Sequence, residues 1–287
     1  MLSVGSLTAT PASPPMSSPS SQPVPVVRLI IFVATMWEFA AVRAAFPGGR
    51  RETFQGRSLY RASAGAGECW VIQTGVGPRN ASVAAQAVLA QQTFSLAISS
   101  GFACALTPAA IGDIVVGIKA AAVDADETVG LDYVEVEGTE RERWRAAIPP
   151  RVTHTSVRDG AFISLDRIVY RAADKVALAQ RTQAVGLDME SAALAREAQA
   201  AQVPFLIVRS VSDLLMEELP LDFNLFLRPT GWLAGVCALF AHPSSLLGLA
   251  RLRRQSVVAA NTLTRCLQAS VNARFGVRPD SPMAMPS

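Results

Sequence analysis

Acidic residues follow predicted buried strands at three points of the chain, where carboxyl groups can act as acids or bases. Glu38 lies one turn into a helix behind the first strand, Glu190 opens a helix in GLDMESAA, and Asp213 ends VPFLIVRSVSD. In an open α/β sheet, ligands bind beyond the carboxyl ends of the strands. Carboxyl groups that converge there between apolar walls have pKa values that are driven apart, so one can donate a proton and another accept one.

A purely structural interpretation competes with the catalytic one at two acidic positions. A carboxylate near a helix N-terminus, such as Glu38, is a routine partner of the helix dipole. Asp188 in GLDMESAA is placed to cap the helix that follows it. For Asp188, and for Glu38 taken alone, we favour the structural interpretation. For Asp213 it is weaker, because an apolar strand leads directly to this residue.

Two glycine-containing segments follow other predicted strands. In TGVGPRNA, Gly75 and Gly77 permit a tight turn, and Pro78 suits the first position of the next helix. This segment lacks the Lys-Ser/Thr pair and the full glycine spacing of a phosphate loop. In SSGFACAL, Gly101 and the small Ala103 either let a ligand approach the backbone or allow close packing of a strand on a helix.

The elements that position these residues alternate along the chain. Short apolar runs predict strands at 26–34, 69–74, 95–100, 113–121 and 205–210, and helical patterns lie at 79–92, 165–180 and 190–202. Strands that alternate with helices of this length are typical of layered α/β domains. We therefore predict one three-layer α/β domain over residues 27–268, with a central mixed, largely parallel sheet.

The two ends of the chain differ in composition from this domain. Residues 1–26 contain six of the 18 prolines, many serines and no charged residue, so we predict a disordered segment. They lack the basic start of a secretory signal, and we expect a cytoplasmic protein. Residues 269–287 are predicted to be a flexible tail.

Composition argues against several classes of protein. The net charge of +3 is small for a nucleic-acid binder, and no basic block is interleaved with aromatic residues. Two histidines and four scattered cysteines give neither metal-ligand spacing nor a disulfide framework. We therefore expect no metal ion, no zinc chemistry and no Ser-His-Asp hydrolase.

Taken in order, the segments resemble the nucleoside phosphorylase and nucleosidase superfamily over roughly residues 27–227. They are most similar to its 5′-methylthioadenosine/S-adenosylhomocysteine nucleosidase branch. The matching segments are Glu38 after a strand, TGVGPRNAA, SGFACAL followed by IGD, DGAFIS, LDMESAA, VPFLIVRSVSD and LDFNLFL. DMESAA and VRSVSD at this spacing are the strongest of these signals. The resemblance implies cleavage of a purine N-glycosidic bond through an oxocarbenium-like ribose, with release of adenine and without a cofactor.

The resemblance also implies roles for individual residues. Asp213 would be the general acid toward N7 of the purine, and Glu38 would orient or deprotonate the attacking water. Glu190 would accept the ribose hydroxyls while Met189 packs on the sugar. The remaining residues expected at the substrate are Phe162 (a face for the base), Ile163 (its backbone at the base edge), Gly101, Phe102, Ala103, Ser212 and Phe223 (near the 5′ group). For Phe223, a place in a helix core is an equally good interpretation.

Water is favoured over phosphate as the nucleophile. Phosphorylases of the superfamily carry an arginine just before the glycine of SGF and a hydroxyl just after it, where this chain has Ser99 and Phe102. Burying a phosphate dianion without a guanidinium group is unfavourable. Arg79 could supply that group, which keeps a phosphorylase as the alternative. Cys104 and Ala105 replace two glycines usual in nucleosidases, which crowds the ribose or water site.

The C-terminal region leaves two alternatives open. RPTGWLAGVCALFAHPSSLLGLARLRRQ resembles hopanoid-associated relatives, which cleave adenine from an adenosyl lipid. A catalytically inactive nucleoside- or lipid-binding protein is the non-enzymatic alternative. Residues 232–240 and 244–252, with Arg251, Arg253 and Arg254, could form a peripheral membrane contact, although a C-terminal helix over the sheet is the simpler interpretation. By analogy with family members, we expect a homodimer.

Overall fold

The computed structural model describes residues 27–65, 67–123, 131–148, 155–220, 224 and 244–276, with the side chains of 244–247 excepted. Four sequence predictions fall wholly or partly outside these residues. They concern the segment 1–26, Phe223, the contact expected from residues 232–240, and the tail from residue 277 on.

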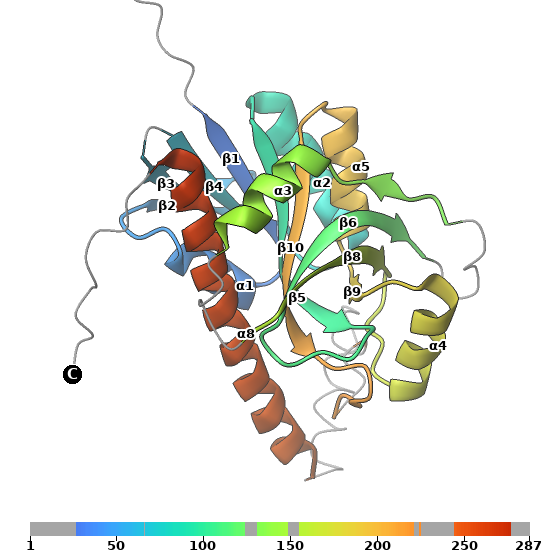
Figure 1. Ribbon diagram of the computed structural model, residues 1–287. Coiled ribbons are helices and arrows are strands. Elements are labelled where there is room, and N and C mark those ends of the chain that lie inside the picture. The colour runs from blue at the N-terminus through green and yellow to red at the C-terminus, as the bar shows by residue number, and fades with distance from the viewer. Residues whose placement is uncertain are drawn as a thin grey trace, which may run out of the picture.

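The described residues form a ten-stranded mixed sheet (Figure 1). Its strands are β1 (Arg28–Val33), β2 (Arg50–Phe54), β3 (Arg57–Ala64), β4 (Gly67–Gln73), β5 (Leu96–Ala105), β6 (Ile114–Ala122), β7 (Val134–Glu135), β8 (Val157–Ser164), β9 (Gly186–Asp188) and β10 (Phe205–Asp213). The order is β10-β6-β8-β9-β5-β1-β4-β3-β2, with β7 on β6 and a further pairing of β10 with β5. The five strands predicted from the sequence correspond to β1, β4, β5, β6 and β10.

The parallel strands at the centre bring distant parts of the chain to one edge. β1 pairs in parallel with β4 and β5, and β5 pairs in parallel with β10. Their carboxyl ends therefore lie at the same edge of the sheet. Nearly every residue of β1 and β10 is buried, as expected for apolar strands that are covered on both faces.

Helices cover both faces of the sheet (Figure 1). They are α1 (Met36–Ala44), α2 (Pro78–Gln91), α3 (Gly138–Ala147), α4 (Ala172–Thr182), α5 (Ser191–Ala200) and α8 (Ser244–Phe275). α2 packs on α5, whereas α8 packs on α1, α3 and β10. This arrangement confirms the predicted three-layer α/β fold. Among the described helices, none combines the length and the apolar character needed to cross a bilayer.

Two predicted boundaries differ from the structure. The helix expected from residue 165 begins only at Ala172, because the side chain of Asn224 bonds both the backbone N–H and the carbonyl oxygen of Ile168. At the C-terminus, α8 continues to Phe275, past the predicted domain boundary at 268. Ser270 and Val271 are buried there, so residues 269–275 belong to the packed helix rather than to a flexible tail.

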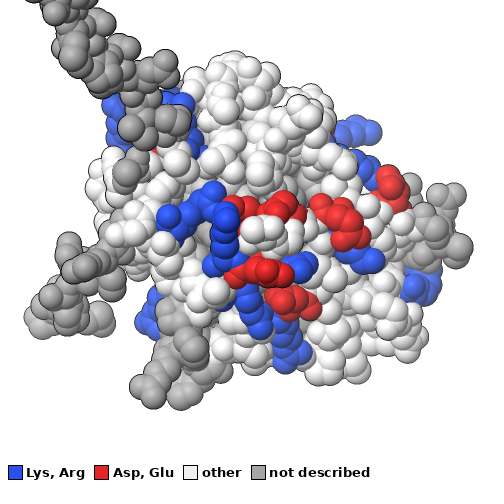
Figure 2. Space-filling model, turned by 45° about the horizontal axis from the view of Figure 1, so that its top comes forward, with Lys and Arg blue, Asp and Glu red and all other residues white. Residues whose placement is uncertain are grey.

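One surface of the molecule carries charges of both signs. Figure 2 shows acidic and basic side chains interspersed on this face rather than separated into a basic patch. Ion pairs link α3 to its neighbours, with Arg145 Nη1 3.2 Å from Asp159 Oδ1 and Arg274 bonded to Glu140.

Candidate active site

A cavity of about 660 Å³ opens at the carboxyl edge of the sheet. Its walls include the start of α1, the carboxyl end of β5, the junction of β9 with α5, the end of β10 and one face of α8. Seven residues predicted from the sequence line it, namely Glu38, Phe102, Ala103, Met189, Glu190, Ser212 and Asp213. The carboxyl groups predicted to meet from distant stretches of the chain therefore do meet in one cavity.

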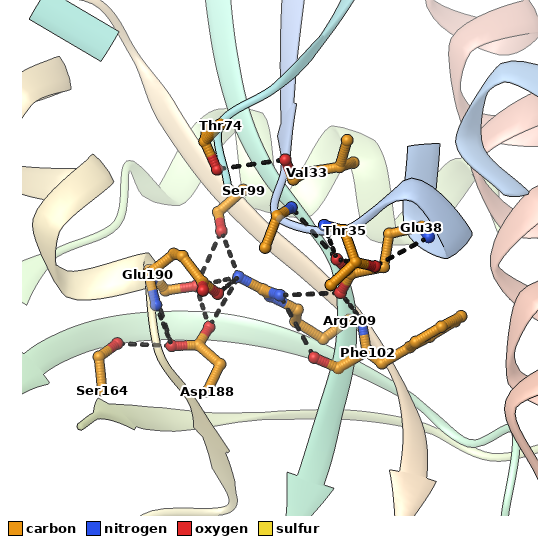
Figure 3. A network of polar contacts seen from close by, with 12 residues as sticks. Val33, Thr35, Glu38, Thr74, Ser99, Phe102, Ser164, Asp188, Glu190 and Arg209 are labelled. Carbon is orange, nitrogen blue, oxygen red and sulfur yellow. Dashed lines mark hydrogen bonds and ion pairs between the residues drawn. The ribbon is translucent and has the colours of Figure 1, made fainter. Parts of the chain in front are cut away.

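A buried arginine in the wall of the cavity lies at the centre of a network of polar contacts (Figure 3). Arg209 is only 2% exposed and has carboxylate oxygens of Asp188, Glu190 and Glu38 at 3.0, 3.6 and 3.7 Å from its guanidinium nitrogens. Its Nη2 also donates to Ser99 Oγ at 2.9 Å. Burial opposes the cation, but the three carboxylates outweigh burial and raise the pKa of Arg209.

Glu38 is held rigidly by local structure. Thr35 caps α1, and Glu38 completes a capping box by accepting the backbone N–H of Thr35 at 2.8 Å through Oε2. Its Oε1 accepts the backbone N–H of Phe102 at 2.8 Å, which ties α1 to β5. The structural interpretation of Glu38 is therefore confirmed, and its side chain faces the cavity as well.

The DMES segment places two acids with different surroundings. Asp188 accepts the backbone N–H groups of Glu190 and Ser191 at the start of α5, but the N-cap residue is Glu190, so Asp188 is not the helix cap that we predicted. Glu190 receives one backbone bond, from Gly77 N to its Oε1 at 2.8 Å. Burial raises the pKa of Glu190 to about 7, against the opposing charge of Arg209 and with the support of the neighbouring carboxylates.

On the other side of the cavity, Asp213 lines the wall and is paired with a buried lysine behind it. Asp213 Oδ2 accepts a hydrogen bond from Lys175 Nζ at 2.8 Å, while Asp213 Oδ1 is buried without a bonded partner among the described residues. Burial raises the pKa of Asp213, and the ammonium group of Lys175 acts in the opposite direction. Asp213 therefore holds a proton to higher pH than an exposed aspartic acid does.

A family model for the phosphorylase superfamily matches residues 28–228. The chain belongs to this superfamily.

Solved structures have the same fold as this phosphorylase-superfamily chain. A 5′-methylthioadenosine/S-adenosylhomocysteine nucleosidase from Neisseria meningitidis, in complex with methylthio-immucillin-A, is 20% identical with a TM-score of 0.68, over 86% of this chain and 99% of that chain. A nucleosidase of the same kind from Colwellia psychrerythraea 34H, with adenine, is 15% identical with a TM-score of 0.69, over 87% and 96%. Futalosine hydrolase of Helicobacter pylori strain 26695 is 20% identical with a TM-score of 0.61, over 80% and 98%.

Phe162 and Ile163 do not line the cavity of this superfamily member. Both side chains are fully buried, Phe162 in the main core and Ile163 in a second apolar cluster. A Cβ atom on Gly186 would lie only 2.5 Å from the ring of Phe162, so this ring fills the space above β9. The prediction that Phe162 offers its ring to a purine base is therefore wrong for this structure, because the ring packs in the protein core.

Gly101 also has a different position from the one predicted. It has a φ of +144°, and a Cβ atom here would lie 2.1 Å from Glu38 Oε1 and 2.9 Å from Arg209 Nη1. The space that we expected a ligand to use is filled by these two side chains. Because Gly101 has no side chain, the carboxylate of Glu38 and the guanidinium group of Arg209 can approach β5 closely.

Sequence reasoning missed two charged residues of the site, Arg209 and Lys175. Arg209 had a visible signal, because an arginine inside the apolar run FLIVRSVSD must find carboxylates when the strand is buried. Lys175 had none, because a lysine on an amphipathic helix ordinarily points to solvent. The suggested phosphate ligand Arg79 is exposed and does not line the cavity.

Proposed function

We propose that this protein hydrolyses the N-glycosidic bond of a purine nucleoside and releases the free base. The observation that carries the proposal is the arginine with three carboxylates around it, opposite a protonatable Asp213 in the same cavity. The nucleosidases and the hydrolase that share the fold support hydrolysis as the reaction type.

The charge around Arg209 favours water over phosphate. A phosphate dianion beside Glu38 would meet three carboxylates and a single guanidinium group that these carboxylates already occupy. The two other arginines that line the cavity, Arg167 and Arg253, are exposed to solvent. Without an available buried cation, burying the dianion is unfavourable, whereas a neutral water molecule meets no such repulsion.

The two halves of the cavity would supply the two proton transfers of the reaction. Asp213 would give its proton to N7 of the purine as the electron pair of the C1′–N9 bond moves onto the base. The oxygen of a water molecule would bond to C1′, and Glu38 would accept the proton that this water loses. The products are the neutral base and the free sugar.

Glu190 is placed to hold the ribose. Gly77 N–H fixes Oε1, while Oε2 lies 3.6 Å from Arg209 and the side chain lines the cavity. A carboxylate in this position is a charge-assisted acceptor for sugar hydroxyl groups. Its charge would also stabilise the oxocarbenium-like sugar that forms as the base departs.

The wall formed by α8 favours an apolar 5′ substituent on the nucleoside. Leu249, Leu252 and Val257 line this side of the cavity together with Ile168 and Leu219. An apolar group buried against such side chains contributes about 25 cal/mol per Å² of covered surface. An adenosyl lipid is the second candidate substrate, since this wall suits a hydrocarbon group better than a charged one.

A panel of nucleosides tests the proposal. Adenosine, methylthioadenosine, adenosylhomocysteine and inosine are incubated with the protein, with and without phosphate, and free base and ribose 1-phosphate are measured. We expect free base at the same rate in both conditions and no ribose 1-phosphate. A requirement for phosphate would replace hydrolysis by phosphorolysis. Tight binding without any base release would favour the non-enzymatic alternative.

A further inference from the structure

Lys175 is a fully buried lysine on α4. A buried ammonium group is unfavourable unless every N–H finds an acceptor. Lys175 Nζ has three acceptors, Asp213 Oδ2 at 2.8 Å, the carbonyl oxygen of Leu214 at 3.2 Å and that of Glu217 at 2.6 Å. The ammonium group therefore joins α4 to the end of β10 and to the turn that follows.

The position of Lys175 leaves the two oxygens of Asp213 unequal. Oδ2 is occupied by the ammonium group, and the buried Oδ1 has no bonded partner among the described residues. Asp213 lines the cavity, whereas Lys175 does not. Because Oδ1 is shielded from solvent, the carboxyl group meets the cavity only through the small exposed part of its side chain, while Lys175 holds Oδ2 from behind.

We propose that Lys175 is a positioning residue that acts through Asp213: it fixes the carboxyl group by holding Oδ2 and stabilises the carboxylate that remains after the proton has left. The expected effect of Lys175 on reaction rates rests on the proposed function. Lys175 itself gains and loses no proton in this step. The proton moves from Asp213 to the base, and the new negative charge on Asp213 lies beside a positive charge that is already in place.

Two other side chains act on Asp213. The Cys104 thiol, from the strand partner of Asp213 on β5, lowers the pKa of the carboxyl group as Lys175 does. The Glu217 carboxylate, from the turn after β10, is paired with Arg251 of α8 at 2.8 Å. Burial and Glu217 raise the pKa of Asp213, whereas Lys175 lowers it. Removing Lys175 should therefore leave Asp213 a weaker acid.

The first test measures the titration of Asp213 directly. Carbon-13 NMR of aspartate-labelled protein gives its midpoint, and the Asp213→Asn variant assigns the signal. In Lys175→Met we expect a midpoint higher by about one pH unit or more, because an opposite charge in contact shifts a carboxyl pKa by about one to three units. In the matched control Arg274→Met, which loses an ion pair between α8 and α3, the midpoint should not move. An unchanged midpoint in Lys175→Met overturns the proposal, even if the protein hydrolyses no nucleoside.

The second test uses base release. In Lys175→Met, kcat should fall about tenfold to a hundredfold, and the loss of activity at alkaline pH should move to higher pH, because Asp213 keeps its proton longer. Lys175→Arg, which retains a positive charge, should restore the pH profile. A merely structural lysine would lower kcat without moving this profile.

A double variant keeps the test decisive if Lys175→Met does not fold. Asp213→Asn with Lys175→Met removes both charges of the pair, so no unpaired ion is buried. If Lys175 acts through Asp213, the double variant should release base as fast as Asp213→Asn alone, within about twofold. A further loss of tenfold or more would show an independent role and contradict the proposal. No base release by the wild type would instead reject the proposed function and leave the NMR result to decide on Lys175.

Discussion

The two halves of the cavity use buried cations in different ways. Around Arg209, three carboxylates share one guanidinium group, and backbone N–H groups fix the acids further. Around Lys175, one ammonium group meets one carboxylate and leaves an oxygen of it unbonded. Under the proposed function, carboxyl groups would serve as fixed acceptors beside Arg209 and as a proton donor beside Lys175. Burial raises the pKa of both Glu190 and Asp213, and the cation beside each opposes that rise, so the two acids differ in their charged neighbours and not in the direction of the shift.

The largest effect is expected from a substitution at Asp213. Asp213→Asn removes the proton donor, yet the amide oxygen can still accept from Lys175, so the fold should persist. We expect base release to fall by about two to four orders of magnitude. Adenine release and thermal unfolding, measured on the same preparation, check both statements. Activity close to that of the wild type would remove Asp213 from the mechanism.

A change at Glu190 probes the other half of the cavity. Glu190→Gln should lower base release by about tenfold to a hundredfold, because a charged acceptor for the ribose is lost.

The same variant should change how stability depends on pH. The pKa of Glu190 is raised to about 7 in the folded state, above its ordinary value near 4.5, so the folded protein binds the extra proton between these pH values. Its contribution therefore makes stability fall as pH rises from about 4.5 to 7. In Glu190→Gln this decline should flatten, as urea unfolding at several pH values would show. An equally steep decline would assign the effect to other groups.

A smaller change tests whether the crowding around Arg209 matters. Gly101→Ala places a methyl group 2.1 Å from Glu38 Oε1 and is strained at a φ of +144°. We expect a loss of about 1–3 kcal/mol in the free energy of unfolding, together with reduced activity. Gly138→Ala is the matched control, because no atom lies within 4 Å of the new methyl group. Equal stability of the two variants would contradict the packing described at Gly101.

The smallest effect is expected from a substitution in the apolar wall that α8 contributes to the cavity. Leu252→Ala should raise KM by roughly fivefold to tenfold for nucleosides with an apolar 5′ group and leave adenosine unaffected. Val258→Ala, at a half-exposed position of α8 outside the cavity lining, is the control. The same KM change for adenosine would argue against a 5′ site on α8.

The sequence predicted which acids lie at the carboxyl ends of the strands, but not the ion pairs that these acids form there. Buried parallel strands are apolar runs, so β1 and β10 could be recognised and the acids at their ends located. The β2–β3 hairpin was missed because Arg50, Arg51 and Glu52 interrupt any apolar pattern. The ion pairs of Arg209 and Lys175 join residues far apart in the chain, and no local periodicity records such pairs.

Helix α8 lies beyond residues 28–228, the part that matches the superfamily, and yet it forms a wall of the cavity. Under the proposed function, bond cleavage and selection of the 5′ group of the nucleoside would be encoded in separate stretches of the chain. Grafting α8 onto a related nucleosidase should therefore transfer a preference for apolar 5′ groups, while the recipient keeps its own catalytic residues.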